Sequence, residues 1–198
     1  AIARNINSEK AILLKRFNNV EVHQCDLLDV SKLEDLFSDA YGIFGNTTPT
    51  KGWLLGRGSM VHSYELEQGR NLINAVKRVR QKGHLKHFIF SSICKAKDPL
   101  KCDPAPGHFS NKWRIEEYII QKGLLDITTI IRPVSYYENF RIKILEINML
   151  NIILPGIVNE NKKWQIIAVD DIGKWTTVIF QNHKRFIGQS LNIAGEDL

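Results

Sequence analysis

Short apolar stretches alternate along this chain with stretches in which apolar residues recur every three or four positions. The short stretches, which are typical of β-strands, cover residues 19–26, 41–46, 87–92 and 125–133. Between them, helical spacing runs from Ser8 to about Phe17, from about Met60 to Gln81 and from Asn111 to Lys122. The pattern therefore predicts strands that alternate with helices.

Two further helices are predicted from their capping residues. Ser31 and Glu34 form an S-x-x-E capping box, which predicts a helix that begins there and continues to about Ala40. Asp171 is a suitable cap for a last helix over residues 172–180.

Alternation of this kind predicts a parallel sheet whose ligands bind beyond the carboxyl ends of the strands. The residues that follow the predicted strands are polar or common in turns: Asp26, Leu27, Asn46, Thr47, Thr48, Ser91, Ser92 and residues 135–139. Ordinary loop composition would also account for them.

Composition narrows the class of protein. The chain has 198 residues, 43% hydrophobic and 24% charged, which suits one globular domain with a sizeable core. No apolar run reaches the roughly 18 residues of a membrane span, and the first ten residues do not resemble a signal peptide. Cys25, Cys94 and Cys102 show no C-x-x-C spacing, so we expect a reducing compartment, the cytoplasm or the nucleus.

The formal net charge of +6 favours anionic partners, either a phosphorylated cofactor or nucleic acid. Basic residues concentrate between Lys77 and His87, at the end of a predicted helix. Cations at that position also complement the helix dipole, which is the simpler explanation. Because no aromatic residues are interspersed among them, nucleic acid is the less favoured partner.

Eight segments, in this order and spacing, resemble the NmrA-like family of atypical short-chain dehydrogenases. They are ARN, QCDLLD, EQGRNLINAVK, HFIFSS, HFSNKWRIEEYI, IIRPVSYYENF, AVDDIG and GQSLNIAG. The resemblance implies a Rossmann-type parallel sheet with helices on both faces, and NADP(H) as cofactor. It also implies a cofactor-binding domain over residues 1–140 and part of a smaller substrate or partner region over 141–198.

One family feature is missing from the sequence. Family members begin with a strand and a glycine-rich G-x-x-G-x-x-G turn, whereas this sequence contains no such motif and starts where their second strand ends. We therefore expect a fragment of a longer protein. A chain that truly lacked the turn would offer the cofactor diphosphate no helix N-terminus and should bind it poorly.

The resemblance assigns cofactor contacts to residues near the amino end. Arg4 corresponds to the residue that grips the 2′-phosphate of NADP, for which a guanidinium is suited, and Asn5 could add a hydrogen bond. Asp26 and Leu27 correspond to an adenine-contacting pair, and Thr47 and Thr48 to the loop beneath the cofactor. A surface arginine and a turn aspartate are the alternatives.

His108 and Lys112 stand where active dehydrogenases have Tyr-x-x-x-Lys, a spacing that places both side chains on one face of a helix. The resemblance implies that Lys112 holds the nicotinamide ribose, and whether His108 acts as an acid stays open. An i,i+4 pair between Lys112 and Glu116 is the alternative.

A further segment of the chain is expected beside the nicotinamide. Tyr136, Tyr137, Glu138 and Asn139 match the aromatic-Glu-Asn segment that lies there in the family, although a packed tyrosine at a helix start would look the same.

No H-E-x-x-H, G-x-S-x-G or Walker A motif occurs, so we expect neither a metal site nor a hydrolase. Two functions remain favoured. The first is an NADP(H) sensor with little catalysis, whose protein partner would be a transcription or signalling regulator, with a homodimer as an open possibility. The second is an NADPH-dependent oxidoreductase of the isoflavone or quinone reductase type.

Overall fold

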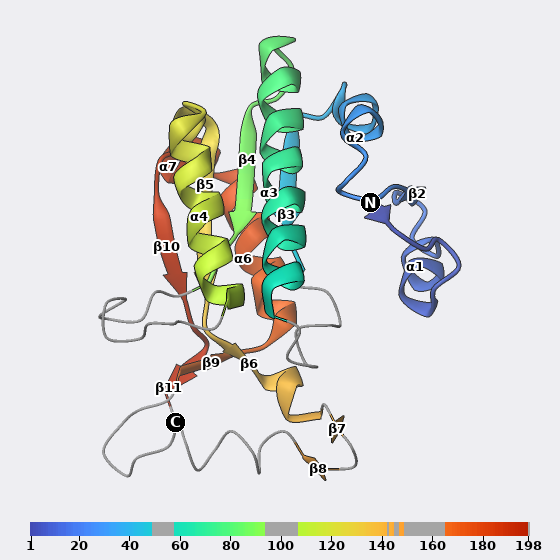
Figure 1. The fold of residues 1–198 in the computed structure, drawn as a ribbon, viewed down its shortest axis with the longest axis vertical. Coiled ribbons are helices and arrows are strands. Elements are labelled where there is room, and N and C mark those ends of the chain that lie inside the picture. The colour runs from blue at the N-terminus through green and yellow to red at the C-terminus, as the bar shows by residue number, and fades with distance from the viewer. Residues whose placement is uncertain (49–57, 94–106, 142, 145–146, 149–164, 198) are drawn as a thin grey trace. The chain divides into compact units, whose positions relative to one another are not determined.

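The structure is a computed structural model of the chain (Figure 1), which describes residues 1–48, 58–93, 107–141, 143–144, 147–148 and 165–197. The side chains of residues 58–63, 107–110, 140–148 and 197 lie outside the description. The chain forms two compact units, each described by itself below. The first unit comprises residues 1–41 and 47–86, and the second comprises residues 42–46 and 87–198.

A four-stranded parallel sheet forms the second unit, in the order β10-β5-β4-β3. Its strands are β3 (Gly42–Asn46), β4 (His87–Ser91), β5 (Thr128–Pro133) and β10 (Ser190–Ile193). β3 and β4 pair from Gly42 opposite His87 to Asn46 opposite Ser91, so their carboxyl ends lie together. The predicted parallel, Rossmann-type sheet is confirmed.

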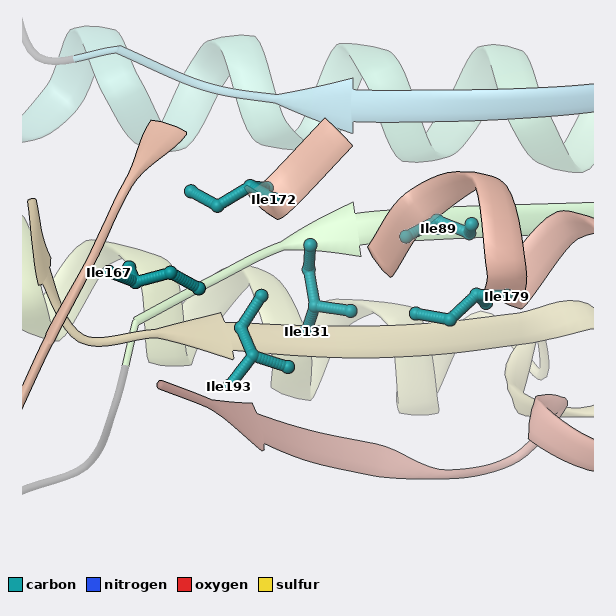
Figure 2. Close-up of a cluster of buried hydrophobic side chains, with 6 residues drawn as sticks. All are labelled: Ile89, Ile131, Ile167, Ile172, Ile179 and Ile193. Atoms are coloured by element: carbon teal, nitrogen blue, oxygen red, sulfur yellow. The ribbon is translucent and has the colours of Figure 1, made fainter. Parts of the chain in front are cut away.

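The two faces of this sheet contact different helices because neighbouring residues of a strand point to opposite sides. One face packs on α6 (Val169–Gln181), where six buried isoleucines meet (Figure 2): Ile89, Ile131, Ile167, Ile172, Ile179 and Ile193. The other face contacts α4 (Gly107–Gln121), where Phe90 lies under the Lys112 ammonium. Helices on both faces are thereby confirmed for this sheet.

Smaller elements complete the second unit. β6 (Ser135–Tyr136), β9 (Gln165–Ile167) and β11 (Glu196–Asp197) form a three-stranded sheet with β9 in the middle. The others are the 3-10 helices η2 (Leu125–Ile127) and η3 (Tyr137–Arg141), the short helix α7 (His183–Phe186), and the paired strands β7 (Lys143–Ile144) and β8 (Ile147–Asn148).

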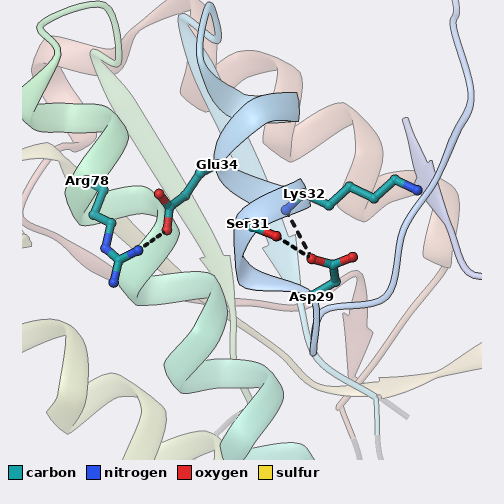
Figure 3. Close-up of polar contacts among 5 residues, drawn as sticks. All are labelled: Asp29, Ser31, Lys32, Glu34 and Arg78. Carbon is teal, nitrogen blue, oxygen red and sulfur yellow. Dashed lines mark hydrogen bonds and ion pairs between the residues drawn. The ribbon is translucent and has the colours of Figure 1, made fainter.

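In the first unit, β1 (Ile2–Ala3) and β2 (His23–Gln24) pair in parallel, and α1 (Glu9–Leu14) lies between them in the sequence. As predicted, Ser8 caps α1, and its Oγ accepts a hydrogen bond from the Ala11 amide. α2 (Val30–Phe37) packs against α3 (Gly58–Gln81), and Arg78 of α3 forms an ion pair with Glu34 of α2 (Figure 3).

The predicted capping box is wrong. α2 begins at Val30, and its cap is Asp29, whose Oδ1 accepts hydrogen bonds from the Lys32 amide at 3.1 Å and the Ser31 hydroxyl at 3.0 Å (Figure 3). The aspartate reaches the amide three residues ahead, so the helix starts two residues before the predicted one. Glu34 turns instead to Arg78.

The predicted cap of the last helix is wrong as well. α6 begins at Val169, so Asp171 lies within its first turn and its carboxylate accepts from Lys174 Nζ at 2.7 Å. The Val169 amide at the helix start donates to both carboxylate oxygens of Glu138, at 3.1 and 3.2 Å. A cap supplied by a residue 31 positions away leaves no local signature in the sequence.

Several other boundaries differ from the prediction. β2 covers only His23–Gln24, α1 ends at Leu14, and residues 125–127 form a 3-10 turn ahead of β5. α3 and α4 start earlier than predicted, at Gly58 and Gly107. No helix in the described ranges is long and apolar enough to span a membrane.

We predict opposite effects on stability for two Gly→Ala substitutions in the second unit. A Cβ at Gly42 would lie 2.7 Å from the Phe180 ring, whereas a Cβ at Gly173 would meet nothing within 4 Å. Overpacking should make Gly42→Ala destabilising by about 1–3 kcal/mol. Gly173→Ala lies inside α6 and should stabilise by about 0.5–1 kcal/mol. Urea unfolding of both variants measures these changes, and equal effects would contradict the packing described.

The second stability prediction concerns His87, which is fully buried at the start of β4. Thr129 donates its hydroxyl hydrogen to the Phe186 carbonyl at 2.7 Å, so it accepts from His87 Nε2 at 2.8 Å. Nε2 of the ring therefore carries a hydrogen. Burial, together with the nearby His183, lowers the pKa of His87 to about 4 from its usual 6.5.

Because the folded-state pKa of His87 lies below the unfolded one, the unfolded chain takes up the proton first as the pH falls. We expect the free energy of unfolding to decrease between about pH 6.5 and pH 4, by about 3 kcal/mol in all from this group. In His87→Leu this part of the pH dependence should disappear, whereas exposed His84→Ala should keep it. An unchanged slope in His87→Leu would contradict the assignment.

Candidate functional site

The Lys112 ammonium is the centre of the polar site in the second unit. It lies on the second turn of α4, and the residue is only 3% exposed. Its Nζ donates to Asn46 Oδ1 at 2.7 Å and to the Ser91 carbonyl oxygen at 3.1 Å, and it lies 5.4 Å from the centre of the Phe90 ring. The predicted site residue thus lies at the carboxyl ends of β3 and β4.

Glu116, one turn further along α4, binds Arg132 of β5. Arg132 Nε donates to one carboxylate oxygen at 3.0 Å and an η nitrogen donates to the other at 2.6 Å, a two-point contact in a largely buried place. Both carboxylate oxygens of Glu116 therefore serve the guanidinium across the helix-sheet interface.

Ser92 follows β4 directly and is 4% exposed. Its amide donates to the Ile131 carbonyl at 2.8 Å, which fixes the backbone at the strand end. Among the described residues its Oγ has no hydrogen-bond partner. The Ser92 hydroxyl can therefore still form a hydrogen bond, and it lies at the end of β4 that the Lys112 ammonium contacts.

His108 lies in the first turn of α4, one turn before Lys112, as its spacing predicts. The side chain of His108 lies outside the described part of the structure. Cys94 and Cys102 also lie outside the described residues. The proposed acid role of His108 stays a prediction.

The segment Tyr136–Asn139 is held mainly by contacts within the second unit. Tyr136 packs against the isoleucine cluster, and burial, followed by the nearby Glu138, raises the pKa of its hydroxyl. Tyr137 donates to Glu196 Oε2 at 2.8 Å, which raises the pKa of the Tyr137 hydroxyl. Glu138 caps α6, and Asn139 lies half-buried in η3. These contacts give the segment a structural role, and its place beside a nicotinamide stays a prediction.

In the first unit, four predicted residues follow β1 and β2. Because these strands are parallel and in register, Arg4 and Asn5 emerge at the same end as Asp26 and Leu27. Arg4 is exposed and makes no hydrogen bond or ion pair with any described residue. Asn5 Oδ1 accepts from the Asn7 amide at 2.9 Å, and Asp26 Oδ1 accepts from the Leu28 amide at 3.0 Å. Asp26 therefore acts as a turn residue, and its contact with an adenine stays a prediction.

Thr47 and Thr48 are fastened to α3 within the first unit. The Thr47 hydroxyl donates to Glu65 Oε1 at 3.2 Å, and both residues are buried, at 2% and 0% exposure. The Thr48 amide donates to Gln68 Oε1 at 3.4 Å. Thr48 itself is exposed, so of the two threonines it is the one whose side chain a ligand could reach.

The structure thus forms two groups of predicted residues, one in each unit. Sequence reasoning missed several residues that hold them, namely Asn46 as the partner of Lys112, the Glu116–Arg132 pair, and Glu65 and Gln68. Asn46 could have been found from its place at a strand end. Nothing in the sequence around Glu65 indicates its role, because its partner Thr47 is 18 residues away. No three His, Cys, Asp or Glu side chains among the described residues are grouped to hold a metal ion.

Solved structures with this fold include a transcriptional regulator, a quinone oxidoreductase and a triphenylmethane reductase. The chain superposes on NmrA, a negative transcriptional regulator, with a TM-score of 0.74 and 21% identity, covering 100% of this chain and 59% of that one. The NADPH-dependent quinone oxidoreductase QOR2 of Escherichia coli, complexed with NADPH, gives a TM-score of 0.66 at 18% identity, with 99% and 59% covered. A Citrobacter triphenylmethane reductase complexed with NADP(H) gives 0.64 at 16% identity, with 100% and 61% covered.

These likenesses show the fold, and this chain spans about three fifths of the length of each of these three proteins. Comparison with curated protein sequences found no match. The sequence model of the NmrA-like family, however, matches residues 1–198, the whole of the chain. The chain therefore belongs to the NmrA-like family, whose fold is of the NAD(P)-binding Rossmann type.

Proposed function

We propose that this chain is the NADP(H)-binding part of a redox-sensing regulator that has little catalytic activity of its own. The observation that carries the proposal is the buried Lys112 ammonium, held at the carboxyl ends of two parallel strands by Asn46 Oδ1 and the Ser91 carbonyl oxygen. In sheets of this kind ligands bind at that edge, and a fixed ammonium there suits the hydroxyl oxygens of a ribose.

Preference for the phosphorylated cofactor is assigned to Arg4. Its exposed guanidinium follows β1 and has no partner among the described residues, so it can make a two-point contact with a phosphate. Asn5, Asp26 and Leu27 lie at the same strand ends and would surround the adenosine. The residues present therefore fit the adenosine half of NADP(H), and the cofactor when bound would supply hydride chemistry.

The absence of the usual catalytic tyrosine favours sensing over catalysis. His108 occupies that position, a pattern resembling a human redox sensor of the same family. The solved structure of NmrA is of a negative transcriptional regulator. For sensing, a protein partner must bind with different affinities to the oxidised and reduced forms of the complex. We infer a transcription or signalling regulator as that partner, encountered in the cytoplasm or the nucleus.

An NADPH-dependent oxidoreductase is the second candidate function. Two proteins with this fold are reductases solved with NADPH or NADP(H), and one acts on quinones. The Ser92 hydroxyl, buried near Lys112 and without a partner among the described residues, could orient a substrate carbonyl oxygen. Lys112 would serve both functions in the same way.

Cofactor titration of the full-length protein tests the proposed binding. NADPH and NADP⁺ should bind more tightly than NADH and NAD⁺. Arg4→Ala should weaken only the phosphorylated pair, by roughly ten- to a hundredfold, because a charge-assisted contact is lost. Arg16→Ala, another exposed arginine of the first unit, is the control. Equal affinity of the unmodified protein for NAD⁺ and NADP⁺ would contradict the role given to Arg4.

Turnover separates the two candidate functions. The sensor proposal predicts that the full-length protein oxidises NADPH at no more than background rate across a panel of quinones, although it binds NADPH. Rapid NADPH oxidation that is abolished in Lys112→Ala would instead establish the reductase. Absorbance at 340 nm records both outcomes, and binding of NADPH to each variant is measured in parallel.

A further inference from the structure

We propose that Asn46 is a positioning residue, whose side-chain oxygen sets the direction of the Lys112 ammonium and thereby the affinity for a ribose-bearing ligand. This inference rests on the proposed function, in which Lys112 holds the ribose. It adds a residue that lies 66 positions away in the sequence and has no assigned role so far.

The geometry around Nζ carries the argument. A lysine side chain has four rotatable bonds, so an unrestrained ammonium would occupy many positions and lose entropy on binding a ligand. Here Nζ lies 2.7 Å from Asn46 Oδ1 and 3.1 Å from the Ser91 carbonyl oxygen. Two acceptors in fixed directions hold the ammonium in one place, which lowers the entropy that Lys112 loses when it binds a ligand.

The two acceptors differ in how they depend on the sequence. The Ser91 oxygen belongs to the backbone of β4, so it would be present with any residue at that position. The Asn46 oxygen belongs to a side chain at the last position of β3, directly opposite Ser91 in the sheet. The chain therefore depends on this one residue for the shorter of the two hydrogen bonds.

Chemistry makes asparagine well suited to the position. An ammonium has only donors, so the amide of Asn46 must turn its oxygen toward Lys112. A carbonyl oxygen holds the ammonium without neutralising its charge, which keeps Lys112 attractive to the oxygens of a ligand. The Phe90 ring beneath Nζ, 5.4 Å away, adds a cation-π contact that favours the same place.

The first arm of the test observes Lys112 without any cofactor. In ¹⁵N-lysine-labelled full-length protein, ammonium protons that are buried and hydrogen-bonded exchange slowly with water and give an NMR signal, which Lys112→Ala assigns. Asn46→Ala should broaden or remove that signal, and Asn46→Asp, which keeps an oxygen in place, should restore it. An unchanged signal in Asn46→Ala overturns the positioning role, whatever the cofactor does.

The second arm is a double-mutant cycle read by NADPH affinity. Asn46→Ala should weaken binding roughly five- to twentyfold. Because Asn46 acts through Lys112, the double variant should bind no more weakly than Lys112→Ala alone. Gln121→Ala, exposed at the end of the same helix, is the matched control and should bind as the unmodified protein does.

The outcomes distinguish the two proposals. If Asn46→Ala binds NADPH normally while Lys112→Ala does not, or if the two losses multiply, the positioning role is wrong and the proposed function stands. If Lys112→Ala itself binds NADPH normally, the proposed role of Lys112 fails, and the NMR arm still decides whether Asn46 holds the ammonium.

Discussion

The candidate functional site depends on one constraint, the burial of the Lys112 ammonium group. Removing a charged group from water costs several kcal/mol unless polar partners replace the water. Lys112 meets this requirement with Asn46 Oδ1, the Ser91 carbonyl and the Phe90 ring, and these groups belong to the ends of β3 and β4. The same contacts that make burial tolerable also join α4 to the sheet and fix where the charge lies.

The two faces of the sheet carry different kinds of residue: one face packs into the apolar core, and the other carries the polar residues of the site. Along β4 and β5, Ile89 and Ile131 point into the apolar cluster with α6. Their neighbours Phe90 and Arg132 point the other way, to Lys112 and Glu116 of α4. In a strand that is buried on both faces, one residue can thus pack into the hydrophobic core while the next residue contributes to the functional site.

Much of the fold followed from periodicity, because strands buried on both faces and long amphipathic helices are strong patterns. The start of a helix was harder to predict where its cap comes from a residue that the local pattern does not single out. Asp171 was a plausible cap, but Glu138 reaches the start of α6 from another part of the chain. Ser31 was a plausible cap too, but Asp29 lies closer to the helix start and takes the role.

For the site, the sequence singled out Lys112 by its spacing from His108, and the structure places its ammonium at the ends of β3 and β4. The residues that hold this ammonium could not be predicted from the local sequence. Asn46 is 66 positions from Lys112, and Arg132 is 16 positions from Glu116, so only the sheet brings each pair together. Tyr137 and Glu138 were expected at the cofactor, and the structure shows them tied to Glu196 and to α6. The residues of a sequence motif can thus be needed for structural contacts as well as for contacts with a ligand.

The most direct test of the central claim is a crystal structure of the full-length protein with NADPH bound. The account predicts that Lys112 Nζ lies within hydrogen-bonding distance of a ribose hydroxyl of the ligand and is still in contact with Asn46 Oδ1. A complex in which Lys112 stays remote from the ligand, or in which NADPH binds without any contact to the carboxyl ends of β3 and β4, would contradict it.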